Sequence, residues 1–310
     1  MNNIQHLKYA VEVERTGSIS QAAKNLFMGQ PHLSKAIKEL EDSLGIIVFN
    51  RTPQGVVPTV KGIEFLRYAK SILVQVEEME SLYKQTDETV HRFDISVPRA
   101  SYISYAFSEF AGTLKNETEI DLNYRETNSM QAIKNVADNV NNIAVIRYQE
   151  LYGKYFISAL AERDIEYLLI WEFDYLLLMS SMHPLAGYET ITGSDLQQYT
   201  EIIHGDISIP ALPPSEARQI EKADDRKKKI AVYERGSQLE LLRRLPSTYM
   251  WVSPMPQDVL DCFSLVQKKC SVSNNHFKDV LIYRKGYHLS AEDNLFIDIL
   301  KKTVDMVAVK

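Results

Sequence analysis

The side chains best suited to chemistry in this sequence lie close together, between Gln30 and Lys38. The segment opens with Gln-Pro, and proline at a first helical position costs no hydrogen bond, so we expect a helix to begin there. The outward face of that helix carries hydrogen-bond donors and no carboxylate before Glu39; its members are Gln30, His32, Ser34, Lys35 and Lys38. Gln and Lys can reach base edges in a major groove, and Ser hydroxyls and helix-start amides can hold phosphates. The face therefore indicates nucleic-acid recognition, although an ordinary solvated helix face can have the same composition.

Three helices are expected to hold that face in place. The first ends before Gly17, and its apolar side consists of Ile4, Leu7, Ala10 and Val11. Ser18 and Gln21 form an S-x-x-Q capping box that begins the second helix, and two adjacent alanines allow close approach to a partner. The third helix, from Gln30, ends at Gly45, and its apolar stripe consists of Leu33, Ala36, Ile37, Leu40 and Leu44.

A wing follows the third helix. Ile46, Val48 and Phe49 favour a strand, and the segment from Arg51 to Val56 adds a Pro/Gly turn and a second strand. The turn has a cation, Arg51, at its base. Three helices followed by such a hairpin predict a winged helix-turn-helix.

The run GSISQAAKNLFMGQPHLSKAIKELEDSLGIIVFNRTPQGVVPTVKG resembles the N-terminal signature of LysR-type regulators, in which A-A-x-x-L, Q-P-x-L-S-x-x-I-x-x-L-E, G-x-x-x-F-x-R and T-x-x-G follow in one register. The resemblance implies that Gln30, Pro31, Ser34 and Lys35 lie at the groove and that the wing follows the flanking backbone. The predicted DNA-binding residues are Ser18, Gln30, Pro31, His32, Ser34, Lys35, Lys38, Arg51, Thr52 and Gln54. Many members carry a second cation where this chain has Gln54, which weakens the expected minor-groove contact.

A long helix is expected from Thr59, a suitable N-cap, to the polar stretch 84–91. Its apolar residues step by four and three, which is coiled-coil spacing. We predict that they form a dimer contact, and they are Phe65, Ala69, Ile72, Val76, Met79 and Tyr83. The alternative is that this helix packs on its own domain. Helix-turn-helix proteins commonly bind as two copies, which favours the dimer.

The rest of the chain alternates strands and helices. Strands are expected at 93–97, 120–125 and 143–146, with helices at 100–114 and 129–140 between them, and this order predicts a parallel sheet. Two more strands at 166–171 and 175–180, a helix start at Asp195, a strand at 279–284 and a last helix capped by Ser290 and Asp293 follow.

This part resembles, more weakly, the effector-binding region of LysR-type proteins, two α/β lobes hinged like a periplasmic binding protein. The fold class is thus α+β overall, with an all-α winged helix-turn-helix, a linker helix and a two-lobed α/β domain. The predicted domains are 1–58 for DNA binding, 59–90 for the linker and 91–310 for the effector domain. Within the last, lobe I spans about 91–163 and 270–310, and lobe II about 164–269.

The resemblance places an effector between the lobes. The matching positions are Arg99, Ala100, Ser101, Asn128, Ser129, Arg147, His204 and Ser237, with Gly236 beside the last. Ser129 is expected to cap a helix whose free amides attract a carboxylate, which favours a small anionic or zwitterionic metabolite. A purely structural cap at Ser129, solvated arginines and an ordinary histidine are the alternatives.

Charge and composition agree with a regulator. Residues 1–70 hold nine Lys or Arg against six acidic residues, a net of +3, whereas the whole chain carries −6, so residues 71–310 carry −9. A positive head on an acidic body suits a polyanion-binding module attached to a part that avoids nucleic acid. Asp224 to Lys229, a charged run, is interpreted as a solvated loop.

No protease, lipase, P-loop or dinucleotide motif occurs, and the histidines lack metal spacing, so we expect no enzyme, no cofactor and no metal. Cys262 and Cys270 have no C-x-x-C spacing and are interpreted as inert thiols, with redox sensing as the alternative. The absence of a signal peptide or spanning segment predicts a cytoplasmic protein.

The predicted function is sequence-specific transcriptional regulation modulated by a metabolite. The predicted partners are double-stranded DNA, a small effector and further copies of the chain, as a homodimer that assembles into a homotetramer. Two other classes stay open: an enzyme built on the α/β part, and a non-specific DNA-architectural protein.

Overall fold

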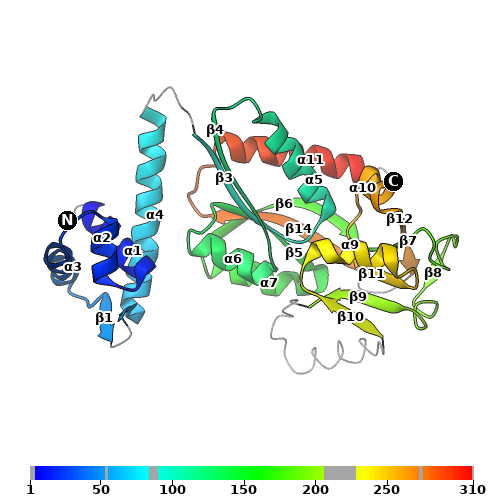
Figure 1. Ribbon diagram of the computed structural model, residues 1–310, viewed down its shortest axis with the longest axis horizontal. Coiled ribbons are helices and arrows are strands. Elements are labelled where there is room, and N and C mark those ends of the chain that lie inside the picture. Colours follow the sequence, from blue (N-terminus) through cyan, green and yellow to red (C-terminus); the bar gives the residue numbers. More distant parts are fainter. Residues whose placement is uncertain (1–3, 53–54, 84–89, 206–227, 272–274, 309–310) are drawn as a thin grey trace. The chain divides into compact units, whose positions relative to one another are not determined.

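The computed structural model describes residues 4–52, 55–83, 90–205, 228–271 and 275–308 (Figure 1). The chain forms two compact units, residues 1–87 and 88–310. The fold is α+β, with a helix-turn-helix unit followed by an α/β unit built on two sheets. The finer boundaries predicted from the sequence, between the DNA-binding domain, the linker and the two lobes, stay predictions.

The first unit is helical with one hairpin. Its elements are α1 (Ile4–Thr16), α2 (Ile19–Asn25), α3 (Gln30–Leu44), β1 (Phe49–Thr52), β2 (Gly55–Pro58) and α4 (Val60–Tyr83). The strands β1 and β2 pair antiparallel, as expected of a wing. Side chains from all three short helices and the hairpin share one core, which includes Ala10, Ala22, Leu33, Leu40 and Val48.

Local signals in the sequence determine where these helices begin and end. Ser18 caps α2, because its Oγ accepts a hydrogen bond from the Gln21 amide at 3.3 Å. The Gln21 side chain bonds to Asn25 on the next turn, so the predicted capping box forms only in one direction. Gly45 ends α3 in the left-handed region at φ 68°, which glycine adopts at little cost. The predicted end of α1, the predicted start of α2 and both predicted ends of α3 are confirmed.

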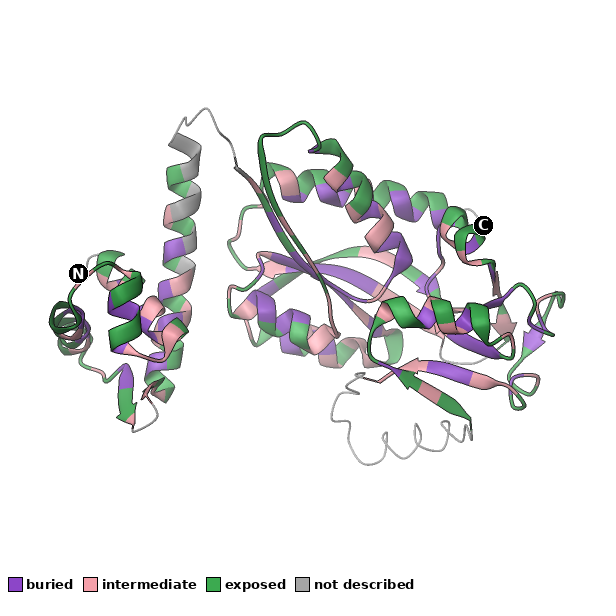
Figure 2. Ribbon diagram, viewed as in Figure 1, coloured by how far each residue is buried: buried purple, intermediate pink, exposed green. Residues whose placement is uncertain are grey.

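The long helix α4 begins at a side-chain cap. Thr59 Oγ1 accepts a hydrogen bond from the Gly62 amide at 2.9 Å and donates one to the Ile47 carbonyl at 2.6 Å. Farther along α4, Ala69 and Leu73 pack against Leu7 of α1. Figure 2 shows such buried positions recurring along α4 among exposed ones. One side of α4 therefore packs against α1 of the same unit.

The second unit contains a five-stranded sheet in the order β4-β3-β5-β14-β6. Its strands are β3 (Val90–Val97), β4 (Glu119–Glu126), β5 (Ile143–Gln149), β6 (Ile165–Asp174) and β14 (His276–Arg284). The strands β3, β4 and β5 are parallel, whereas β14 runs antiparallel to both of its neighbours. The predicted βαβαβ order is confirmed. The strand β6, within the range predicted for lobe II, is hydrogen-bonded into this first sheet.

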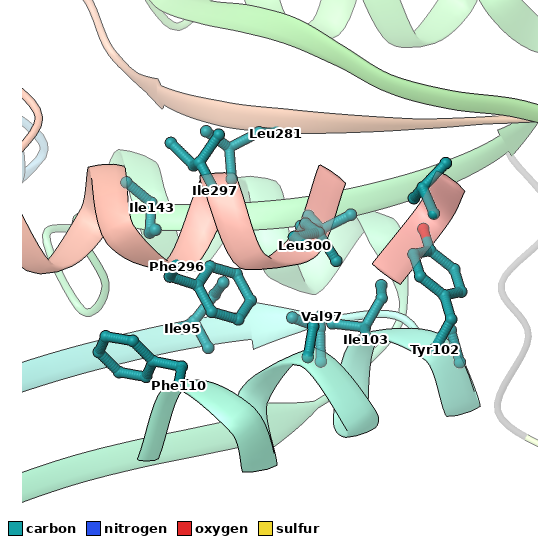
Figure 3. Close-up of a cluster of buried hydrophobic side chains, with 14 of the residues drawn as sticks. Ile95, Val97, Tyr102, Ile103, Phe110, Ile143, Leu281, Phe296, Ile297 and Leu300 are labelled. Atoms are coloured by element: carbon teal, nitrogen blue, oxygen red, sulfur yellow. The ribbon is translucent and has the colours of Figure 1, made fainter. Parts of the chain in front are cut away.

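Helices cover both faces of this sheet (Figure 1). One face carries α5 (Ser101–Thr113) and α11 (Ala291–Ala308), and the other carries α6 (Ser129–Ala137) and α7 (Gly153–Ala161), preceded by the short helix η1 (Glu150–Tyr152). Figure 3 shows the first layer, in which Phe110 and Phe296 pack with Ile95 of the sheet. At the start of α11, Ser290 and Asp293 exchange hydrogen bonds at 3.0 and 2.9 Å, as their spacing predicts.

The second sheet has the order β10-β9-β11-β7-β12. Its strands are β7 (Leu176–Ser180), β9 (Thr200–His204), β10 (Lys229–Val232), β11 (Thr248–Val252) and β12 (Leu265–Lys268), and its helices are α9 (Arg235–Arg244) and α10 (Gln257–Phe263). Two short strands, β8 (Ile191–Thr192) and β13 (Cys270–Ser271), pair in parallel as a separate two-stranded sheet. The predicted helix start at Asp195 is wrong: residues 193–199 form turns, and the Asp195 carboxylate accepts bonds from the Thr192 amide and hydroxyl.

The chain passes between the two sheets of the second unit twice, and the two connecting segments, called the crossings here, are hydrogen-bonded to each other. The chain passes from β6 to β7 at Tyr175 and reaches β14 just after Asn275. The Tyr175 amide donates to the Asn275 carbonyl at 3.0 Å, and the Asn275 side chain donates back to the Tyr175 carbonyl at 2.5 Å. The Tyr175 ring also stacks on Phe277 with centroids 3.8 Å apart. The two connections therefore form one structural element.

Candidate nucleic-acid interface and ligand pocket

The N-terminal half of α3 presents the predicted polar face to solvent. Gln30, Pro31, His32, Lys35 and Lys38 are exposed, and Ser34 is half-buried. The opposite side of the same helix is buried through Leu33, Ala36, Ile37 and Leu40. The amphipathic pattern of α3 therefore fixes which side chains face outward.

The wing is attached to this face. Arg51 of β1 donates a hydrogen bond to Ser34 Oγ of α3 at 2.9 Å. The Glu41 carboxylate of α3 accepts hydrogen bonds from the Val48 and Phe49 amides at 2.7 and 3.0 Å. These bonds attach the start of the hairpin to α3. A groove lies between α3 and the hairpin; its polar lining consists of Ser34, Lys38, Glu41 and Arg51.

The remaining predicted DNA-binding residues have structural contacts or lie elsewhere. Lys35 is 3.6 Å from Glu39, and both side chains are mostly exposed, so this ion pair is weak. Ser18 caps α2, and the Thr52 hydroxyl donates to the Gly55 carbonyl at 3.1 Å. Gln54 lies outside the described residues. The structure thus brings α3 and Arg51 together on one surface.

A buried ion pair lies where β5 and β14 run side by side. Arg147 forms a two-pronged contact with Asp279, from Nε at 2.7 Å and from an Nη at 2.6 Å, and Tyr102 donates to the same carboxylate. Burial alone would lower the pKa of Arg147, but the charge and hydrogen bonds of Asp279 outweigh it and raise this pKa above its usual value. Burial and then the charge of Asp279 raise the pKa of Tyr102, so its hydroxyl stays protonated as a donor.

A second ion pair joins α9, beside the second sheet, to the end of β4 in the first sheet. Arg235, the first residue of α9, contacts Glu126 at the end of β4 and donates to Ser101 Oγ at 2.6 Å and to Ser104 Oγ at 3.3 Å. A cation at a helix N-terminus is unfavourable for the helix itself, so these contacts with the first sheet's side explain its position. Arg99 adds a second link by donating to the Tyr233 carbonyl at 3.1 Å.

These groups line a small pocket between the two sheets. Five predicted effector residues line it: Arg99, Ala100, Ser101, Arg147 and His204. Near His204, the Gln238 amide lies 2.5 Å from the imidazole Nδ1. The other predicted residues, Asn128, Ser129 and Ser237, are not among the lining residues.

The role predicted for Ser129 needs correction. The cap of α6 is Asn128, whose side chain accepts from the Gln131 amide at 2.9 Å, and Ser129 is the first helical residue. The Ser129 hydroxyl donates to the Arg147 carbonyl at 2.6 Å and accepts from the Arg147 amide at 3.1 Å. It therefore links α6 to β5. Gly236 and Ser237 are exposed on α9.

Sequence reasoning missed several residues of the pocket. They are Tyr175, Arg235, Gln238, Met250, Trp251, Val252, Ser253 and Met255. Arg235 directly precedes the two residues that the family pattern did suggest, so a helix start predicted there would have included it. The segment 248–252, rich in β-favouring residues and placed before Ser-Pro, carried a strand signal that could have identified β11.

The chain thus combines a winged helix-turn-helix with a two-sheet α/β unit that has a pocket between its sheets. Residues 4–63 match the family model of the bacterial regulatory helix-turn-helix proteins, lysR family. The match shows that residues 4–63 form a helix-turn-helix domain of the lysR family, in agreement with the motif read from the sequence.

Curated relatives are regulators as well. A probable RuBisCO transcriptional regulator of Thalassiosira pseudonana is 29% identical over 185 residues, which cover 59% of this chain and 58% of that protein. The HTH-type transcriptional regulator BsdA of Bacillus subtilis is 39% identical over 77 residues, 24% of this chain and 27% of that protein. The chain thus spans less than two thirds of the length of each of these relatives.

Solved structures share the fold along the whole chain. A full-length OxyR variant from Pseudomonas aeruginosa has a TM-score of 0.64 at 15% identity, covering 100% of this chain and 96% of that one. Full-length CbnR in complex with its target DNA has a TM-score of 0.56 at 15% identity, with 97% and 100% covered. Among the described helices of this chain, none combines the length and apolar character needed to cross a membrane.

Proposed function

We propose that this chain is a sequence-specific, DNA-binding transcriptional regulator whose DNA binding or activation is modulated by a small anionic or zwitterionic metabolite held between the two sheets of its second unit. The exposed, carboxylate-free N-terminal half of α3, joined to the wing through Arg51 and Ser34, carries this proposal. Two relatives that are transcriptional regulators and the solved complex of CbnR with its target DNA support the proposal. The same relatives support a regulator over an enzyme, and a cytoplasmic location goes with that role.

DNA recognition is assigned to α3, with its N-terminal residues at base edges and Arg51 at the flanking backbone. Gln30 and Lys35 supply groove donors, whereas the buried side of α3 supplies only packing. The probe for testing this is the duplex that the wild-type chain selects from a random-sequence pool.

Gln30→Ala and Lys35→Ala should each weaken binding to the selected duplex by about 1 to 3 kcal/mol, because each removes a groove donor without touching the core. Fluorescence anisotropy at one fixed salt concentration measures this. Arg244→Ala, which removes an exposed cation of α9, is the matched control and should bind like the wild type. Unchanged affinity in both α3 variants would remove this helix from the recognition role.

The ligand is assigned to the pocket lined by Arg99, Ser101 and Arg235. The Arg147–Asp279 pair is almost completely buried, whereas the side chains of Arg235 and Glu126 each keep about a fifth of their surface exposed. A ligand carboxylate could bind Arg235 and Arg99, and a ligand ammonium group could bind Glu126, the present partner of Arg235. That charge pattern favours a zwitterion or a small carboxylate.

A panel of amino acids and small carboxylic acids should contain a compound that raises the unfolding temperature of the full chain. Ligand at about a hundred times its Kd stabilises the native state by about 2.7 kcal/mol. Arg235→Met should abolish this rise, and Arg244→Met on the same helix should keep it. The pocket assignment fails if Arg235→Met responds to the same compound with wild-type affinity in calorimetry.

Assembly is proposed to begin with α4. Exposed Tyr68, Ile72 and Met79 form an apolar stripe along the side of α4 next to the one that packs on α1. Val76 and Phe65 are half-buried, Ala69 is buried against α1, and Tyr83 ends the helix. A homodimer through this stripe, assembling into a homotetramer, agrees with two-site DNA binding.

A further inference from the structure

The turn between α2 and α3 ends α2 with a phenylalanine in an unusual conformation. The Phe27 amide donates to the Lys24 carbonyl at 3.1 Å, and the Met28 amide donates to the Ala23 carbonyl at 3.0 Å. This bond pair is the Schellman motif, which requires a left-handed residue after the helix. Phe27 takes that position with φ 52°.

Other left-handed positions in the chain carry residues that tolerate them. The non-glycine residues with positive φ in the described ranges are Phe27, Asn139, Asp164 and Ser264. Asn, Asp and Ser have short polar side chains that can bond locally, whereas a large side chain pays a steric cost there. Gly45, at the end of α3, shows the usual solution. Phe27 is therefore the one bulky residue among these described positions.

Phe27 gains nothing from the fold in return. Its side chain is 99% exposed, so it contributes no burial to the first unit. The exposed ring adds no stability to the fold, and the left-handed backbone at Phe27 carries a steric cost that glycine would remove. Strain that the fold itself does not require is a known mark of functional positions.

The surroundings of Phe27 indicate what it contacts. Phe27 precedes Gln30 by three residues, so their Cα atoms lie within about 11 Å. Lys24 of α2 and Gln30 and His32 of α3 are exposed nearby in the chain. An apolar group bordered by a cation and groove donors, in a unit with net positive charge, is complementary to a nucleic-acid duplex rather than to an apolar protein surface.

We propose that Phe27 is a DNA-contacting residue that packs its ring on an apolar part of the duplex, a thymine methyl group or a deoxyribose, beside the bases that α3 faces. The inference rests on the proposed function, since it assumes that α3 enters the groove. Phe side chains contact thymine methyl groups in known modes of base recognition. The contact compensates for the strain at Phe27.

Phe27→Gly in the full-length chain tests this proposal on the duplex selected by the wild type. Binding should weaken on the order of tenfold, as expected for loss of most of one buried aromatic contact. The unfolding midpoint should rise by a few degrees, because glycine relieves the left-handed strain. Ser264→Gly, at an equivalent left-handed position in the second unit, is the control and should leave DNA affinity unchanged.

The duplex identifies the contacted group. Deoxyuridine in place of single thymines removes one methyl group at a time, and a loss seen with the wild type but not with Phe27→Gly assigns the methyl contact. Weaker binding of Phe27→Gly without such coupling assigns the deoxyribose. If Phe27→Gly binds the duplex with wild-type affinity, or if its unfolding midpoint is lower than that of the wild type, the inference about Phe27 is wrong. The proposed function is unaffected by that result. A wild-type chain that selects no duplex overturns the proposed function as well.

Discussion

Gly62→Ala should destabilise the first unit by about 3 kcal/mol, despite placing a better helix former inside a helix. A Cβ on Gly62 would lie 2.0 Å from the Val48 carbonyl oxygen and 2.9 Å from its carbon. Both are backbone atoms, and the same oxygen accepts the Thr59 amide at 2.9 Å. The start of α4 and the strand β1 would have to separate. The T-x-x-G pattern therefore has a steric cause.

Chemical denaturation of the full chain, followed through the transition of the first unit, measures this loss. Gly112→Ala is the matched control: Gly112 is exposed in α5, and a Cβ there would have nothing within 4 Å. That control should be neutral or stabilising by up to about 1 kcal/mol. An equal response of the two variants would show that Gly62 is not sterically required.

Arg147→Met should destabilise the second unit by about 3 to 5 kcal/mol, because it leaves the fully buried Asp279 carboxylate without its cation. The Arg147 guanidinium also lies 4.8 Å from the Phe173 ring centre, so the variant loses that contact too. Urea denaturation of the full chain gives the free energy of unfolding.

The double variant Arg147→Met/Asp279→Asn should recover part of the loss, since no charge then stays buried and unpaired. Arg244→Met breaks an exposed ion pair of α9 and should cost less than about 1 kcal/mol. A loss for Arg147→Met as small as that of Arg244→Met would mean that water reaches Asp279 and that the pair is not structurally important.

Local chemistry explains what the sequence could predict. Pro31, Ser18 and Gly45 act within one helical turn of their own positions, so the bounds of α2 and α3 follow from neighbouring residues. Alternating apolar runs likewise gave the parallel strands of the first sheet. The helix expected at Asp195 failed because the Thr192 amide and hydroxyl bind its carboxylate in a turn instead.

Long-range pairing explains what it could not predict. Arg235 and Glu126 are 109 residues apart, and no local pattern links them. Ala69 fits the four-three spacing of a dimer stripe, but α1 covers it within the same unit. Spacing gives the angle of a residue around a helix and not the surface that meets it. The prediction that Ser129 caps α6 failed for a local reason. Asn128 and Ser129 are both good N-cap residues, and the cap is Asn128.

The joined crossings at Tyr175 and Asn275 constrain how the second unit can move. Two independent connections would let the sheets shift, tilt and twist separately, whereas crossings that are hydrogen-bonded and stacked on each other must bend together. If the links made by Arg235 and Arg99 were released, the remaining freedom of the sheets would be rotation about the line of the crossings. Such a mechanism behaves as a lever: a change of a fraction of an ångström near that line becomes a larger displacement at the far end of either sheet, and its direction is set in advance.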